Sequence, residues 1–450
     1  MENTKNIKRY ITHKNIALAI LFVIFLFSNL IPPSGIAGGN FYEYSSGGYA
    51  AGDTASLLPF TYSSIPYENY YHGTMNWILR PLSKIIPVID IRVTGFLLFL
   101  AVFAFFGVII YKINFKKKWH AVLFEFMTIF VFGDFAYLLH YNTITTQGLL
   151  LASILIMTFI LLWQFYVKTS VFMSVIYCLL CLFAGGLSEG WFILGIFLNL
   201  LIIPTFLIRN DKKYILSVSL ACVLSITAVS ALFGGGVSEQ IKYDNLVNST
   251  FYGIYKDNPM SVDSTFQDTA LIEKYAGKSN FEIEEKIDID YSYSDILGYY
   301  IKNPSFFKEK LEITAGNAFE IRARYLANQP DGTLKNGFTL YSALKRRFMQ
   351  PSLWFVIAVA LGIIVFCGLN IKSEGNKKVK AHYLYMIILA LISLYAFVAP
   401  LIISGEAGIS EKLFCYNIIF DIMLLNAVIG GAIISSTRRD KLKEKYGVNQ

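Results

Sequence analysis

The chain has 450 residues, of which 55% are hydrophobic and only 16% are charged, and its formal net charge is +8. Soluble domains carry about 25% charged residues, so this composition excludes a water-soluble protein of this length. The long apolar runs instead predict membrane spans. The positive charge alone would also suit nucleic-acid binding, and the positions of the Lys and Arg residues decide that question.

Ten apolar segments are predicted to form transmembrane helices, because a span takes about 20 mainly apolar residues. The fifth and sixth are separated only by Ser188 and Glu189, so a re-entrant pair is an alternative there. All five cysteines lie in apolar runs, where Cys behaves as a small hydrophobic residue, so we expect no disulfide framework. The ten segments are residues 16–31, 93–111, 121–139, 149–166, 171–187, 190–208, 214–233, 353–371, 383–403 and 413–435.

The distribution of Lys and Arg predicts the orientation, because cytoplasmic loops are enriched in both residues. With the N-terminus in the cytoplasm, the inner segments hold 21 Lys and Arg residues and the short outer loops hold 4. We therefore expect a plasma-membrane protein with both termini in the cytoplasm, and nucleic acid is not needed to explain the charge. The first apolar run has no A-x-A cleavage site, which favours a retained anchor over a signal peptide.

The spans divide the chain into three parts. Residues 1–233 are predicted to form an N-terminal membrane domain with a long outer loop at 32–91, and residues 351–450 a C-terminal membrane domain. Between them, residues 234–350 form an extracytoplasmic segment. Its stretch 291–319 has near-helical apolar spacing interrupted at Asn303-Pro304, which predicts a helix pair packed on its own core or on the membrane surface.

Acidic residues on the outer side mark the candidate chemistry, because acids in or near a membrane are costly and are usually paired or functional. Asp53 lies in the first outer loop, Asp134 near the outer end of the third span, Glu189 after the fifth, and Glu406 between the last two. Asp134 and Glu189 lie close enough to the interface for water to solvate them, so a hydrated boundary role is the alternative to function. Glu125 is expected to be structural.

The first outer loop combines residue types that suit a sugar phosphate. Around Asp53 the sequence also fits a helix N-cap, which is the plainer reading of that aspartate. Downstream, residues 67–81 bring aromatic, amide and cationic side chains together, His72, Trp77 and Arg80 among them. Aromatic faces with nearby hydrogen-bonding groups suit sugar rings, and Arg suits phosphate oxygens. Arg80 alternatively snorkels at the edge of a span.

With these pieces the chain resembles the GT-C superfamily of membrane glycosyltransferases, and is similar in particular to the O-antigen glucosyltransferases and uncharacterised bacterial relatives. The matching features are a cytoplasmic N-terminus, one span, a long outer loop with an acid, WILR at 77–80, GGLSEG at 185–190 and IKNPSFFK at 301–308. The family's loop acid usually follows the first span closely and is often doubled. Asp53 stands alone and further on, so Glu43 and Glu68 are kept as alternatives.

The resemblance implies an all-α, GT-C-like fold that transfers a sugar from a polyprenyl-phosphate donor to a cell-surface glycan or lipid-linked acceptor. Asp53 would be the base for the acceptor hydroxyl, and cations would stabilise the departing phosphate. Trp77, His72, Asp134 and Glu189 complete the expected substrate site. A divalent cation, Mg²⁺ or Mn²⁺, held by Asp53, Asp134 and Glu189 is left open. The candidate phosphate clamp comprises Arg80, Arg92, Arg322, Arg324, Arg346 and Arg347.

Two other functions fit the same layout. A polysaccharide polymerase or ligase also pairs many spans with a large outer segment, and a product assay separates single-sugar addition from chain extension. A flippase or transporter of glycan lipids would need a polar path through the bilayer, whereas the acids here gather on one side. The sugar, the acceptor and the oligomeric state are not encoded in any pattern that we recognise.

Overall fold

The computed structural model describes most of the chain. The described residues are 12–30, 57–58, 89–115, 117–142, 146–187, 192–233, 239–257, 266–321, 338–349 and 351–446. Among them, every regular element is a helix except one antiparallel pair of two-residue strands, β1 (Leu57–Leu58) and β2 (Ile89–Asp90). The predicted all-α class is confirmed.

All ten apolar segments predicted from the sequence are helical. Six helices of the described chain are long and apolar enough to cross a membrane, and a bent pair brings the number to seven. The three shorter apolar helices or helix pairs account for the remaining segments. The six long helices are α5 (Ile91–Lys112), α8 (Thr146–Tyr166), α12 (Lys212–Phe233), α18 (Leu353–Ser373), α19 (Lys377–Ser404) and α21 (Phe414–Tyr446). The bent pair is α6 (Lys118–Phe132) with α7 (Phe135–Leu138). The shorter apolar helices are α2 (His13–Phe25), α9 (Val171–Leu187), and α10 (Phe192–Leu200) with α11 (Thr205–Ile208).

Burial differs among these helices as a lipid environment requires. In α8, 83% of the most apolar stretch is buried inside the bundle, so this helix is central. In α12 and α18 only 17% is buried, although both are strongly apolar. Side chains of this kind need an apolar surrounding that the protein does not provide, and hydrocarbon supplies it. The chain is a multi-pass membrane protein.

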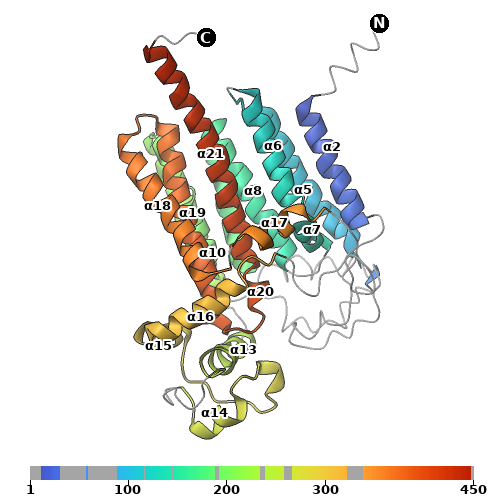
Figure 1. Ribbon diagram of the computed structural model, residues 1–450, viewed down its shortest axis with the longest axis vertical. Coiled ribbons are helices and arrows are strands. Elements are labelled where there is room, and N and C mark those ends of the chain that lie inside the picture. The colour runs from blue at the N-terminus through green and yellow to red at the C-terminus, as the bar shows by residue number, and fades with distance from the viewer. Residues whose placement is uncertain are drawn as a thin grey trace.

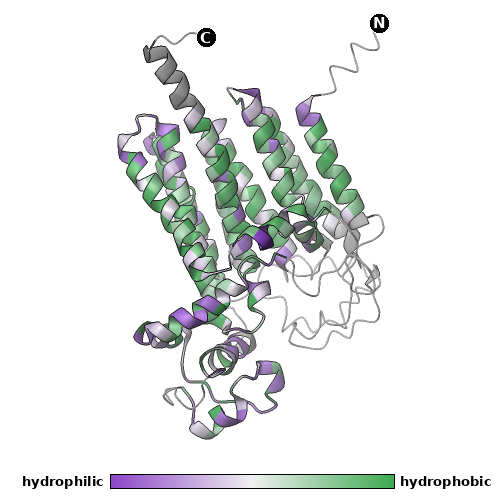
Figure 2. Ribbon diagram, viewed as in Figure 1, coloured by the Kyte–Doolittle hydropathy of each residue, from purple (hydrophilic) through white to green (hydrophobic). Residues whose placement is uncertain are grey.

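The bundle has two unlike ends. Helix α2 begins and α21 ends at the same end, which we call the terminus face (Figure 1). At the opposite end, the domain face, the chain forms an additional helical unit that is more hydrophilic than the bundle (Figure 2). Two short helices, α17 (Leu340–Phe348) and α20 (Ile409–Lys412), also lie toward the domain face. The helices of the unit are α13 (Glu239–Ser249), η4 (Thr250–Ile254), α14 (Thr269–Tyr275), η5 (Asn280–Glu282), α15 (Tyr293–Lys302) and α16 (Pro304–Gly316).

This unit, residues 239–321, has a hydrophobic core of its own. Phe251, Tyr255, Ile296 and Tyr300 are buried together, and α19 contributes Leu401 at its end. The predicted helix pair is confirmed as α15 and α16, which meet at Asn303-Pro304, and Pro304 begins α16 because the first turn needs no N–H from that position. The helices expected in the segment between the two membrane domains are therefore present as a packed unit, and its extracytoplasmic location stays a prediction.

Candidate functional site

Most residues that the sequence nominated for catalysis lie outside the described residues. They are Asp53 with its alternatives Glu43 and Glu68, and His72, Trp77, Arg80, Glu189, Arg322 and Arg324. Arg92 lies in the first turn of α5, but its side chain is not described. Asp134, Arg346 and Arg347 remain, and all three belong to the domain face. The candidate site is therefore built from what surrounds α17 at that face.

Asp134 occupies the corner between α6 and α7, which bend by 60°. One carboxylate oxygen accepts from the N–H of Ala136 at 2.9 Å, so Asp134 caps α7, and the other accepts from the N–H of Ser342 in α17 at 2.9 Å. The side chain is 0% exposed, so the alternative of a hydrated boundary residue is wrong for Asp134, and its predicted role at the substrate stays a prediction. Both oxygens serve to hold helices, and Asp134 is placed as a structural residue of the site.

A buried ion pair fastens α17 from its other end. The Lys345 ammonium donates to an Asp421 carboxylate oxygen at 2.6 Å and to the Asn417 side-chain oxygen at 2.7 Å, both in α21. The hydroxyl of Tyr137 in α7 donates to the second oxygen of Asp421. We call Lys345, Asp421, Asn417 and Tyr137 the α17 anchor. Burial lowers the pKa of Lys345, and the adjacent Asp421 carboxylate opposes that shift.

The sequence reasoning missed Asp421, although a signal for it exists. It is the one acid in the last apolar segment, 413–435, and an intramembrane acid indicates a partner or a function. Its partner, Lys345, lies 76 residues earlier in the chain, so the pairing itself is visible only in three dimensions. Glu125 follows the same rule, since its carboxylate bonds the His13 ring at 2.8 Å between α6 and α2, 112 residues apart, which fits the structural role expected for it.

A second charged group, the outer cluster, joins the domain-face unit to the turn after α19. It comprises Lys256, Asp257, Lys310 and Glu406. The fully buried Lys310 ammonium donates to Glu406 at 2.7 Å and also to Asp257, and Lys256 donates to Glu406 at 2.6 Å. Burial lowers the pKa of Lys256, but the Glu406 carboxylate offsets this effect and the net shift is upward. Glu406 was singled out as an outer acid, and the structure accounts for both of its oxygens.

The turn after α19 also brings two backbones together. Gly405 ends α19 with φ 58°, and a Cβ atom at this position would lie 2.8 Å from the Cα of Gly253 and 2.7 Å from the carbonyl oxygen of Asn248. Only glycine accepts both the left-handed conformation and this contact. Gly405 therefore allows the outer cluster to close directly over the end of the membrane helix.

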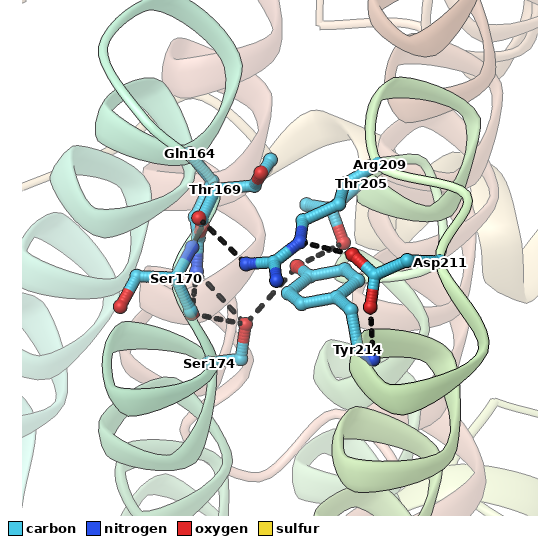
Figure 3. A network of polar contacts seen from close by, with 8 residues as sticks. All are labelled: Gln164, Thr169, Ser170, Ser174, Thr205, Arg209, Asp211 and Tyr214. Atoms are coloured by element: carbon cyan, nitrogen blue, oxygen red, sulfur yellow. Dashed lines mark hydrogen bonds and ion pairs between the residues drawn. The ribbon is translucent and has the colours of Figure 1, made fainter.

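A polar network at the terminus face gives a useful contrast (Figure 3). Arg209 pairs with Asp211, and this pairing lowers the pKa of the Asp211 carboxyl. The same carboxylate accepts from the N–H of Tyr214 at 2.8 Å. The Tyr214 hydroxyl donates to Thr205 at 2.9 Å, and Gln164 donates to Ser174 at 2.8 Å (Figure 3). Two further contacts, from the Arg209 guanidinium to the Thr169 carbonyl oxygen at 3.3 Å and between the Ser174 and Tyr214 hydroxyls at 3.2 Å, join the α8–α9 connection to the α11–α12 connection, so this network is a scaffold for the loops.

By contrast, α17 presents cations without acidic partners. Arg346 and Arg347 follow Lys345 in the last turn of α17 and are exposed, and within the described residues neither forms an ion pair. The Arg347 guanidinium lies 6.0 Å from the ring centre of Phe348. Figure 2 shows this hydrophilic turn against the hydrophobic bundle. An immobilised helix with free guanidinium groups is suited to bind an anion.

The described residues do not form a metal centre. No group of three or more His, Cys, Asp or Glu side chains that could hold an ion occurs among them. Of the three acids proposed for Mg²⁺ or Mn²⁺, only Asp134 is described, and both of its oxygens are already used. Cys178 and Cys181, which are spaced as C-x-x-C, are free thiols with different neighbours, since the Cys178 sulfur lies 3.6 Å from that of Cys222 and the Cys181 sulfur lies 3.6 Å from that of Met157.

Comparison with known proteins gives one match. The family model described as YfdI N-terminal transmembrane domain matches residues 75–448. No curated protein and no solved structure shows significant similarity to the chain. The matched range includes α17, the anchor and the outer cluster, together with Trp77 and Arg80, whereas Asp53 and His72 precede it.

Proposed function

The chain belongs to the family of the YfdI N-terminal transmembrane domain, and from this premise we propose that it is a membrane glycosyltransferase. It transfers a sugar from a polyprenyl-phosphate donor to a cell-surface glycan or lipid-linked acceptor. The observation that carries the proposal is the family match across residues 75–448, most of the chain. The resemblance of the sequence patches to the GT-C superfamily agrees with it.

We assign the reaction to the domain face and that face to the outside of the cell. The inner segments hold 21 Lys and Arg residues, and the described ones among them lie at helix ends on the terminus face, which favours the cytoplasm for both termini. The domain face then lies in the extracytoplasmic leaflet. An acceptor on the cell surface and a lipid-linked donor in that leaflet can meet there.

The reaction needs a base and a stabilised leaving group. The acceptor hydroxyl attacks the anomeric carbon of the donor and loses its proton to a carboxylate, while the bond from that carbon to the phosphate oxygen breaks. The departing lipid phosphate carries the developing negative charge, which guanidinium groups stabilise. We propose Asp53 as the base, Arg80, Arg322 and Arg324 as the cations, and Trp77, His72 and Glu189 as contacts of the sugar. Asp134 contributes by holding α17.

The test of Asp53 is its amide variant. Asp53→Asn keeps the shape of the side chain and removes its basicity, so we expect sugar transfer in membranes to fall by at least about 100-fold, the lower end of general-base contributions. The amount of folded protein in the membrane should not change. Glu43→Gln and Glu68→Gln are the matched controls in the same loop. Full activity of Asp53→Asn with loss in one of the controls would move the base to that glutamate.

A further inference from the structure

The lipid-facing surface of α18 ends at a tryptophan. Exposed apolar side chains follow one side of this helix at intervals of one or two turns: Trp354, Leu361, Val365 and Leu369. Since only 17% of the apolar stretch of α18 is buried, this stripe faces hydrocarbon. Trp354 is 66% exposed and lies in the first turn, at the domain face. Exposed Trp residues at the ends of spans mark the interface between hydrocarbon and headgroups.

Cations and a second aromatic side chain gather at the same end of α18. The Lys308 ammonium from α16 lies 5.7 Å from the ring centre of Trp354. Helix α17 ends a few residues before α18 begins, with Arg346 and Arg347 exposed and Phe348 71% exposed. We call Arg346, Arg347, Phe348, Trp354 and Lys308 the interfacial belt. It combines apolar rings with cations, as surfaces that lie in the headgroup layer do.

The anchor explains why α17 presents these residues in one direction. Lys345 is fully buried against Asp421, so the next two residues of the same turn must project away from α21. On its other side α17 is held by the bond from Ser342 to Asp134. The guanidinium groups are therefore presented by a helix with little freedom to move, and less entropy is lost when an anion binds.

We propose that the interfacial belt binds the phosphate groups of anionic phospholipids in the leaflet at the domain face. Arg346 and Arg347 supply bidentate donors for phosphate oxygens, and Phe348 and Trp354 lie among the acyl-chain ends. All five residues of the belt are exposed, so it is an open surface and suits an abundant headgroup. This role differs from the donor clamp assigned to Arg80, Arg322 and Arg324, and it does not depend on sugar transfer.

The experiment measures lipid binding to the purified full-length chain in detergent by native mass spectrometry. The probes are phosphatidylglycerol, phosphatidylcholine and a polyprenyl monophosphate, titrated separately. Arg346→Gln/Arg347→Gln should weaken phosphatidylglycerol binding by about tenfold or more, because each cation near an anionic surface contributes to attraction. Phosphatidylcholine binding should not change. Lys274→Gln/Lys286→Gln removes the same charge from exposed positions on the domain-face unit and should bind all three lipids as the unmodified chain does.

Three results would overturn the proposal. The first is unchanged phosphatidylglycerol binding in the Arg346→Gln/Arg347→Gln variant. The second is a clear preference of the unmodified chain for polyprenyl monophosphate that this variant abolishes, since the belt would then be part of the donor site. The third comes from a variant that keeps the charge. Arg346→Lys/Arg347→Lys keeps the charge and should retain most of the binding. If it binds as weakly as the Gln variant although its melting temperature is unchanged, charge attraction to the headgroup layer is refuted.

Discussion

Lys345 and Asp421 are both fully buried, and the stability of α17 depends on their pairing. Burying two charges costs several kcal/mol per ion, and the mutual attraction repays this only when the remaining hydrogen-bonding positions are satisfied. Here Asn417 and Tyr137 satisfy them. The pair is thus a specific connection between α17 and α21, and the loss of one partner leaves an uncompensated charge.

The single variant Asp421→Asn should lower the free energy of unfolding by about 3–5 kcal/mol, the usual cost of breaking a buried pair. The double variant Lys345→Met/Asp421→Leu removes both charges and should recover most of that loss. Unfolding in detergent followed by tryptophan fluorescence measures both changes. A double variant that is less stable than Asp421→Asn would show that these residues matter for their shape and not for charge pairing.

Individual residues were predicted unevenly from the sequence. An acidic residue near a membrane is expected to have a partner. Glu125, which bonds His13, and Glu406, which bonds Lys310 and Lys256, confirm this expectation. The identity of the partner was not predictable, because Ser342 lies 208 residues from Asp134 along the chain. A hydrated position was kept as the alternative for Asp134, because the apolar pattern does not reveal that α17 packs over it. The catalytic assignments, Asp53 first among them, remain predictions.

At the scale of elements, apolar length predicted the helices well, because a span must satisfy its backbone hydrogen bonds internally and so is helical. The third segment was the exception, since it read as one straight span and the structure bends it by 60° between α6 and α7. The sequence Gly133-Asp134 carried the signal: α6 ends at Gly133 and Asp134 caps α7. Because the residues on both sides of Gly133-Asp134 are apolar, the whole run was predicted to be one span and the break at this pair was not recognised.

The packing of α9 against α12 can be tested by its cysteines. The sulfur atoms of Cys178 and Cys222 are 3.6 Å apart, and a small approach of the two helices brings them to the bonding distance of about 2.05 Å. Oxidation with copper phenanthroline should therefore form a disulfide between Cys178 and Cys222, detected by peptide mass spectrometry. Cys181, on the same helix but beside Met157, is the internal control. A disulfide from Cys181 to Cys222 instead would mean that α9 is rotated relative to the arrangement described.

At the scale of the whole molecule, two hydrophobic cores meet at one face. The larger runs through the membrane helices and the smaller lies in residues 239–321, with α19 extending into it through Leu401. The outer cluster lies at this junction, since it pairs Lys310 of the unit with Glu406 after α19. Burying charged pairs where two cores meet holds the unit in one position over the bundle. The proposed sugar transfer would use such rigidity, because the donor and the acceptor have to be aligned at one surface.

The sequence patterns predicted a helical unit between the two membrane domains, and α2 begins and α21 ends at one end of the bundle, as the predicted layout requires. They did not predict how the unit is attached, because attachment depends on pairs such as Lys310 with Glu406, 96 residues apart. Topology could be read from many residues together, whereas a site depends on a few contacts that no single-sequence pattern records.

The central claim, sugar transfer from a lipid phosphate, is tested most directly with the purified chain in proteoliposomes. A panel of polyprenyl-phosphate hexoses and a lipid-linked glycan acceptor are supplied, and mass spectrometry follows both lipids. We predict that one donor releases free polyprenyl phosphate while the acceptor gains the mass of a single hexose. Folded protein that releases no polyprenyl phosphate from any donor, or an acceptor that gains a ladder of repeating units, would contradict the account.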